Sequence, residues 1–177
     1  NLVDNHIFAK LRTLGLPPSP LTDDPTFLRR VTIDIAGRLP TLGETNAFLS
    51  DTDPRKRERK IDQLLASTDY ADYFAGKWAA ILRNKRTAAH HARGSFAFHS
   101  WIRESLHQNT PYDKFVQEFV SASGEVGHNP PVIWYRTVKD SKEQLQDVAQ
   151  IFLGQRLQCA QCHLHPYEKW SQDDYYG

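Results

Sequence analysis

The only two cysteines of this 177-residue chain lie three positions apart and are followed directly by a histidine, in the order Cys159-Ala160-Gln161-Cys162-His163. This C-x-x-C-H spacing is the attachment signature of a c-type heme. Two thiols at this spacing can add across the two vinyl groups of one porphyrin, and the adjacent histidine then lies under the iron as the proximal ligand. Segment 159–163 therefore predicts one covalent heme c, held by Cys159 and Cys162, with His163 bound to the iron.

Three other interpretations of the cysteines stay open. A redox-active disulfide uses the same C-x-x-C spacing but normally begins a helix within a βαβ unit, and no βαβ pattern is visible in this sequence. A structural zinc site could use Cys159, Cys162 and His165, because tetrahedral zinc accepts sulfur and nitrogen ligands, but it needs a fourth ligand from elsewhere in the chain. In the third interpretation, both cysteines are inert and buried.

The second axial position of the iron has several candidate ligands. The chain contains no methionine, so ligation by histidine and methionine is excluded within these residues. We favour His99, which precedes Trp101 on an expected amphipathic helix, as the distal ligand. The other histidines considered for this position are His90, His91, His128, His6 and His107. Tyr135, a lysine side chain and an open position are the remaining alternatives.

Residues close to the cysteines are candidates for the surroundings of the heme. Arg156 and Lys169 could pair with its propionates, because a guanidinium suits bidentate contact with a carboxylate. Trp170 and the nearby tyrosines could supply apolar walls over the macrocycle. His165 is too close to His163 in sequence to reach the opposite heme face, so we interpret it as a hydrogen-bonding neighbour of the ligands. Core packing and solvent-facing positions are the simpler alternatives for these side chains.

The spacing of apolar residues predicts helices along almost the whole chain. Helical patterns cover approximately residues 3–14, 24–37, 41–49, 53–65, 70–82, 95–106, 111–119 and 141–154. Thr41 with Glu44, and Ser141 with Gln144, have the spacing of capping boxes. Residues 133–135 form the one segment that we expect to be extended. The predicted fold class is all-α, a single irregular multi-helix domain over residues 1–177 with the heme-attachment motif at its C-terminal end.

The composition limits the classes of function. A content of 40% hydrophobic and 24% charged residues is typical of a globular domain. The net charge of +1 gives no electrostatic attraction to nucleic acid or to an anionic membrane. No apolar stretch approaches the roughly 18 residues of a membrane span, so we expect no membrane insertion in this segment. We also expect that the signal segment is not present in this chain, and that the chain is a fragment of a longer multidomain protein.

Several segments together resemble one known family. They are residues 27–31, 37–41, 61–65, 111–115 and 121–124, together with residues 152–176 around the two cysteines. In these segments the chain is similar to the planctomycete-type cytochrome c-like domain of unknown function, and the resemblance covers nearly its whole length. It implies an extracytoplasmic protein of large multidomain architecture, in which a further domain often follows this one. Some relatives lack the C-x-x-C-H string, and many carry aspartate where this chain has Leu164.

The motif and the resemblance lead to a functional prediction. We expect a c-type cytochrome domain that acts in extracytoplasmic electron transfer, in the periplasm or an equivalent compartment. Its partner would be a redox protein or an adjoining domain of the same polypeptide, and such a relay is not itself an enzyme. The alternatives are a heme enzyme or gas sensor with an open iron position, and a heme-free interaction domain that could bind zinc.

Overall fold

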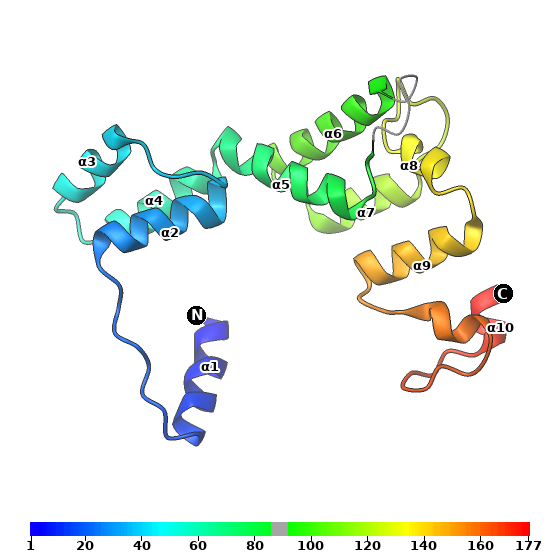
Figure 1. Ribbon diagram of the computed structural model, residues 1–177, viewed down its shortest axis with the longest axis horizontal. Helices are drawn as coiled ribbons and strands as arrows, with labels where there is room; N and C mark the ends of the chain where they lie inside the picture. Colours follow the sequence, from blue (N-terminus) through cyan, green and yellow to red (C-terminus); the bar gives the residue numbers. More distant parts are fainter. Residues whose placement is uncertain (86–91) are drawn as a thin grey trace.

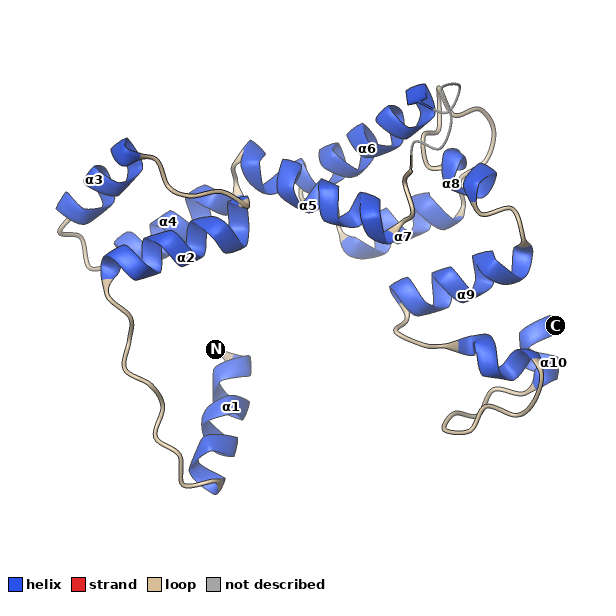
Figure 2. Ribbon diagram, in the orientation of Figure 1, coloured by secondary structure: helices blue, strands red, loops and turns tan. Residues whose placement is uncertain are grey.

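The computed structural model of the chain describes residues 1–85 and 92–177. Over these residues the protein consists of ten α-helices and one 3-10 helix, without a β-strand (Figure 2). The elements are α1 Leu2–Thr13, α2 Asp24–Ala36, α3 Leu42–Ser50, α4 Lys56–Leu65, α5 Thr68–Ile81, α6 Ala92–His107, α7 Tyr112–Val120, α8 Val132–Thr137, α9 Ser141–Phe152, η2 Leu157–Gln161 and α10 Gln172–Tyr176. The all-α prediction is confirmed for this part of the chain. His90 and His91 lie outside the described residues.

The helices form two halves that are joined by α5 (Figure 1). In the N-terminal half, α2 packs against α3 and α4, and α5 contacts α2 at one side and α6 at the other. The C-terminal half contains α6 to α9, and η2 and α10 lie beyond α9 at its lower end (Figure 1). The first helix, α1, stands apart from both halves, and none of its residues is buried. Within the described residues, no helix is both long and apolar enough to cross a bilayer.

The main hydrophobic core lies in the C-terminal half and is largely aromatic. Phe98 of α6, Phe119 of α7 and Trp134 of α8 are all almost completely buried. The ring centroid of Phe119 lies 5.0 Å from that of Trp134 and 5.3 Å from that of Phe152. Aromatic pairs at such separations stabilise a core beyond the effect of buried area. Because Phe152 is the last residue of α9, these contacts fix the helix that leads to the two cysteines.

The prediction of an extended segment at residues 133–135 was wrong. These residues lie in the short helix α8, in which Val132, Ile133 and Trp134 are 8%, 6% and 1% exposed. A continuous run of buried apolar residues has neither helical nor strand periodicity, so the sequence pattern alone does not distinguish the two structures. Here the turn formed by residues 129–132 already has helical hydrogen bonding, since the backbone N–H of Val132 donates to the carbonyl oxygen of Asn129.

The predicted cap of α9 was also wrong by one residue. Asp140, not Ser141, caps this helix, since Asp140 Oδ1 accepts hydrogen bonds from the backbone N–H groups of Lys142 and Glu143 at 2.9 and 3.1 Å. Gln144 does not close a capping box, because its Nε2 donates to the carbonyl oxygen of Val138. Aspartate and serine are both good cap residues, so adjacent candidates are hard to separate from sequence.

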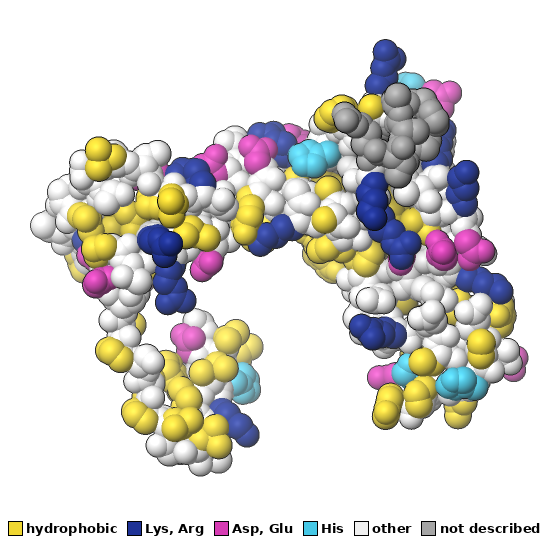
Figure 3. Space-filling view, in the orientation of Figure 1, with side chains coloured by type: hydrophobic (Ala, Val, Ile, Leu, Met, Phe, Trp, Pro, Cys, Tyr) yellow, Lys and Arg dark blue, Asp and Glu magenta, His cyan; other side chains and the backbone are white. Residues whose placement is uncertain are grey.

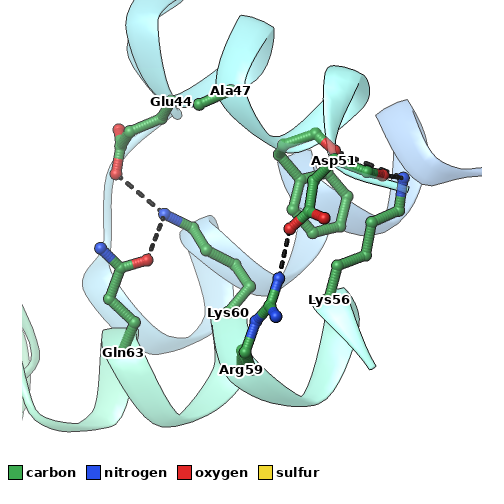
Figure 4. Close-up of a pocket in the computed structure, with 8 residues that line it drawn as sticks. Glu44, Ala47, Asp51, Lys56, Arg59, Lys60 and Gln63 are labelled. Carbon is green, nitrogen blue, oxygen red and sulfur yellow. Dashed lines mark hydrogen bonds and ion pairs between the residues drawn. The ribbon is translucent and has the colours of Figure 1, made fainter. Parts of the chain in front are cut away.

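A polar network around Glu44 stabilises the N-terminal half. The Thr41–Glu44 capping box is confirmed, and the Thr41 backbone N–H donates to Glu44 Oε2 at 2.8 Å. Arg38 donates to both carboxylate oxygens of Glu44 at 2.8 and 3.1 Å, and to Asp69 at 2.7 Å. Lys60, which is only 7% exposed, donates to Glu44 Oε1 at 3.1 Å (Figure 4). One carboxylate therefore connects the start of α3 to α4 and to the end of α2.

Replacing Glu44 with glutamine is expected to lower the free energy of unfolding by about 3 kcal/mol at pH 7, because the buried Lys60 ammonium loses its counter-charge. The bonds from Arg38 hold the pKa of the Glu44 carboxyl well below its ordinary value of 4.5. A lowered folded-state pKa stabilises the protein above the unfolded-state pKa, and this stabilisation is lost as the pH falls below it. Urea unfolding at pH 7 and pH 3 should therefore show a smaller difference between wild type and Glu44→Gln at pH 3.

The matched control for this prediction is Asp72→Asn. Asp72 forms an ion pair with Arg103, but its side chain is 55% exposed, so its loss should change the free energy of unfolding by less than about 1 kcal/mol. Equal losses in the two variants would show that the Glu44 network has no special role in stability.

Candidate functional site

The two cysteines lie on and directly after η2, a single turn of 3-10 helix. The chain leaves α9 through Gly154, whose φ of 67° lies in the left-handed region that glycine adopts without strain. In η2 and its C-terminal cap, the backbone N–H groups of Cys162 and His163 both donate to the carbonyl oxygen of Cys159 at 3.3 Å. Cys159 lies within η2 and Cys162 is its C-terminal cap, so the two cysteines are one turn of chain apart.

The turn is anchored by the alanine between the cysteines. Ala160 is 0% exposed, whereas Cys159, Cys162 and His163 are all exposed. Both cysteines are free thiols. The segment therefore packs through Ala160 and leaves two sulfur atoms and one imidazole accessible. The interpretation of the cysteines as inert buried residues is wrong.

Hydrogen bonds of side chains on α9 and α10 stabilise the position of η2. Gln172 of α10 donates from Nε2 to the carbonyl oxygen of Gln161 at 3.1 Å. Tyr175 is 6% exposed, and its hydroxyl accepts a hydrogen bond from Gln146 of α9 at 2.8 Å. We did not predict α10, although the spacing of Ser171 and Asp174, which form a capping box in the structure, is a recognisable signal for its start. These contacts join η2, α9 and α10 into one unit.

The hydrogen bond of His163 determines which ring nitrogen is free. His163 Nδ1 lies 2.8 Å from the carbonyl oxygen of Leu164. A carbonyl oxygen can only accept, so Nδ1 carries a proton, and in the neutral ring the free lone pair is then on Nε2. Metal-binding histidines typically donate their other ring N–H to a carbonyl or carboxylate, which fixes the tautomer and the ring orientation. The imidazole beside the two thiols is therefore in the form that binds a metal through Nε2.

His165 uses both of its ring nitrogens within the protein. Its Nε2 donates to the carbonyl oxygen of Arg156 at 3.1 Å, and its Nδ1 accepts from the backbone N–H of Tyr167 at 3.3 Å. The backbone N–H of His165 also donates to the carbonyl oxygen of Trp170 at 2.9 Å. These bonds close the loop of residues 164–170 against the start of η2. The predicted role of His165 beside a heme stays a prediction, but its position in the loop is that of a structural support.

The bonds of His165 weaken the zinc interpretation. A zinc ligand must offer an unprotonated ring nitrogen, and the only such nitrogen of His165 already accepts from Tyr167. In addition, no group of three or more histidine, cysteine, aspartate or glutamate side chains is placed to hold a metal ion in residues 1–85 and 92–177. Within the part of the chain that the structure describes, Cys159 and Cys162 therefore have no further ligands grouped with them as a tetrahedral site needs.

The other predicted neighbours lie around the same loop. Trp170 is half-buried, and its Nε1 is buried without a hydrogen-bond partner among the described residues. The Lys169 Nζ lies 5.7 Å from the centroid of the Trp170 ring, and the side chain of Arg156 is exposed. Apolar side chains at this end of the molecule are also exposed, as Tyr167 at 91% shows. Figure 3 shows histidine and hydrophobic side chains together at the lower end of the C-terminal half.

The structure does not bring the predicted distal ligand to this site. His99 lies on α6, and α6 and η2 are on opposite sides of α9 (Figure 1). The elements packed against η2 are α9 and α10. Of the other candidates, His6 lies on α1, His107 ends α6 and His128 lies in the loop before α8. The periodicity of α6 predicted the helix correctly but carried no information about which helix would face η2.

Comparison with protein families gives one match. A family model, PSCyt2, described as "Protein of unknown function (DUF1549)", matches residues 2–177 of this chain. Comparisons with curated proteins and with solved structures find no match.

Proposed function

Because the chain belongs to the DUF1549 family, whose description assigns no function, we propose a function from the chain's own residues. It is a c-type cytochrome domain that holds one heme c through Cys159 and Cys162, with His163 as the proximal iron ligand, and it acts in extracytoplasmic electron transfer. The observation that carries this proposal is one 3-10 turn with two accessible thiols and a histidine whose Nε2 is free.

The donor set of the turn fits a covalently attached heme. Two exposed thiols one turn apart suit the two vinyl groups of one porphyrin, and each thioether forms when the sulfur and its hydrogen add across one vinyl double bond. The unpartnered Nε1–H of Trp170 is a buried donor, which costs free energy unless it finds an acceptor. A heme propionate is an acceptor of the right kind, and two cationic side chains lie nearby in sequence, Arg156 at the start of η2 and Lys169 next to Trp170.

Neighbouring residues orient His163, the proposed iron ligand, and the attachment turn is exposed at the surface. When bound, a c-type heme supplies a one-electron couple between Fe(III) and Fe(II). The bond from His163 Nδ1–H to the Leu164 carbonyl keeps the ring in one orientation. Ala160 and Tyr175 hold the turn against the protein, while both sulfurs remain exposed. An exposed attachment turn suits electron exchange with a partner protein or an adjoining domain.

A second candidate function is ligand binding at an open iron position. The observation in its favour concerns the residues that could be the sixth iron ligand. His165 has no free ring nitrogen, His99 lies on the other side of α9, and the chain contains no methionine. A five-coordinate iron would bind carbon monoxide and shift its absorption bands. A six-coordinate low-spin spectrum that carbon monoxide leaves unchanged would favour electron transfer, with the sixth ligand supplied from elsewhere.

The proposed location follows from the attachment chemistry. Covalent attachment of heme to C-x-x-C-H takes place outside the cytoplasm, so we propose a periplasmic or equivalent extracytoplasmic compartment for this domain. The partner would then be a redox protein of that compartment or a further domain of the same polypeptide.

The direct test is the intact mass of the chain after export through a compartment with c-type heme maturation. We expect the mass to exceed that of the polypeptide by one heme, with a pyridine hemochrome spectrum that survives denaturation. The control is the same chain produced in the cytoplasm without maturation, which should carry no covalent heme. Exported protein with the bare polypeptide mass and two titratable thiols would overturn the proposal, as would one bound zinc ion in place of heme.

A further inference from the structure

A cavity of about 520 Å³ lies in the C-terminal half, at the end opposite to η2. It is bounded by the first turns of α6, by the loop before α8, and by α8 itself, which lie together in Figure 1. The lining residues are Arg93, Gly94, Ala97, Val126, Gly127, Ile133 and Arg136. Its volume is within the range of roughly 300–1,000 Å³ that is usual for small-molecule sites.

The inner wall of the cavity is apolar. A Cβ atom at Gly94 would lie 2.8 Å from Ile133 Cδ1 and 3.3 Å from Val126 Cγ1, so the glycine allows α6 and α8 to approach closely. Gly94 and Ile133 are both buried, and Ala97 is half-buried. Apart from the two arginines, no lining residue among those that the structure describes has a polar side chain. A ligand of this cavity must therefore have an apolar body.

The charges at the cavity have one sign. Arg93 comes from α6 and Arg136 from α8, both side chains are exposed, and no carboxylate belongs to the lining. Over the part of the chain that the structure describes, no carboxylate forms an ion pair with either guanidinium, although such pairs are present for Arg83 and Arg103. Two cations that line one largely apolar cavity raise the local concentration of anions there.

The cavity of about 260 Å³ in the N-terminal half provides a contrast (Figure 4). It is also lined by cations, but each of them has a carboxylate partner. Lys60 pairs with Glu44, Arg59 with Asp51, and Lys56 with Asp24. The positive charge of that cavity is neutralised within the protein, whereas the charge at Arg93 and Arg136 is not.

We propose that the cavity between α6 and α8 binds an apolar molecule that carries a carboxylate. The apolar body lies against Ala97, Val126 and Ile133, and the carboxylate is bound by Arg93 and Arg136 at the mouth. A guanidinium offers two parallel N–H donors that match the two oxygens of a carboxylate. This site is separate from η2, so the proposal does not depend on heme attachment.

The test is isothermal titration calorimetry of the complete chain with decanoate, with decanol as an uncharged ligand of the same length. We expect decanoate to bind at one site per chain and at least about tenfold more tightly than decanol, because a charge-assisted pair of hydrogen bonds is worth more than 1.4 kcal/mol. The double variant Arg93→Gln with Arg136→Gln should lose this preference. Ala97→Trp fills the cavity and should abolish binding of both ligands.

Two further variants keep the test decisive. Arg103→Gln removes a guanidinium from α6 outside the cavity, and should leave the affinity for decanoate unchanged. Arg136→Lys keeps the charge but not the paired donors, and should give an intermediate affinity. Circular dichroism verifies that each variant is folded. Equal affinity for decanoate and decanol, an equal loss in Arg103→Gln, or no heat with either ligand would overturn the proposal.

Discussion

The chain with both Cys159→Ala and Cys162→Ala is expected to carry no heme that survives denaturation. Covalent attachment requires a thioether from at least one of these sulfurs, and the chain has no other cysteine. Alanine at both positions leaves the packing of the turn intact, because the buried anchor of the turn is Ala160 and not a cysteine. Intact mass and a pyridine hemochrome spectrum of exported protein measure the loss, which we expect to be complete.

The single variants separate the two thioether bonds. Cys159→Ala and Cys162→Ala should each retain one bond, at reduced yield, and the remaining free vinyl group should shift the hemochrome bands to longer wavelength. Thermal unfolding of the heme-free double variant should resemble that of wild type produced without maturation, which serves as the matched control. Covalent heme in the double variant would contradict the assignment of both sulfurs.

Helices with strong local signals were predicted close to their observed bounds. Asp23 caps α2 by accepting from the backbone N–H of Thr26, and Gly37 ends the helix with a φ of 69°. These are contacts between residues three or four positions apart, so the sequence contains them directly. The next residue, Asp24, forms ion pairs with Lys56 and Arg57 of α4. That contact depends on the packing of α2 against α4, which no local pattern encodes.

The candidate site also combines features that the local sequence predicts with features that depend on contacts made in the folded chain. The spacing of Cys159, Cys162 and His163 is a local property, and it predicted which atoms would come together on one turn. The free Nε2 of His163 depends on a backbone carbonyl, and the loss of His165 as a metal ligand depends on the carbonyl of Arg156, nine residues away. The sequence does not show which backbone carbonyl oxygen accepts a given hydrogen bond, because every residue has one. Periodicity likewise shows the buried face of α6 but not its neighbours, so the sequence alone does not place His99 relative to η2, and its role as distal ligand stays a prediction.

His163→Ala is expected to change the iron spectrum more than any other single histidine substitution. Among the described residues near the thiols, the variant loses the ring nitrogen that is free to bind iron, while the thioether bonds still tether the heme. We expect a lower yield of attached heme and a high-spin spectrum, which added imidazole should convert toward that of wild type because it restores a nitrogen ligand. Absorption spectra of the ferric and ferrous protein, with and without imidazole, measure both effects.

The matched control is His99→Ala, which removes a half-buried histidine from α6 on the other side of α9. Because α6 does not form the site at η2, this variant should keep the wild-type spectrum and should not respond to imidazole more than wild type does. If His99→Ala produced the high-spin, imidazole-restored spectrum and His163→Ala did not, iron would be bound away from the turn. That outcome would contradict the assignment of His163 as the proximal ligand and would place the imidazole ligand on α6.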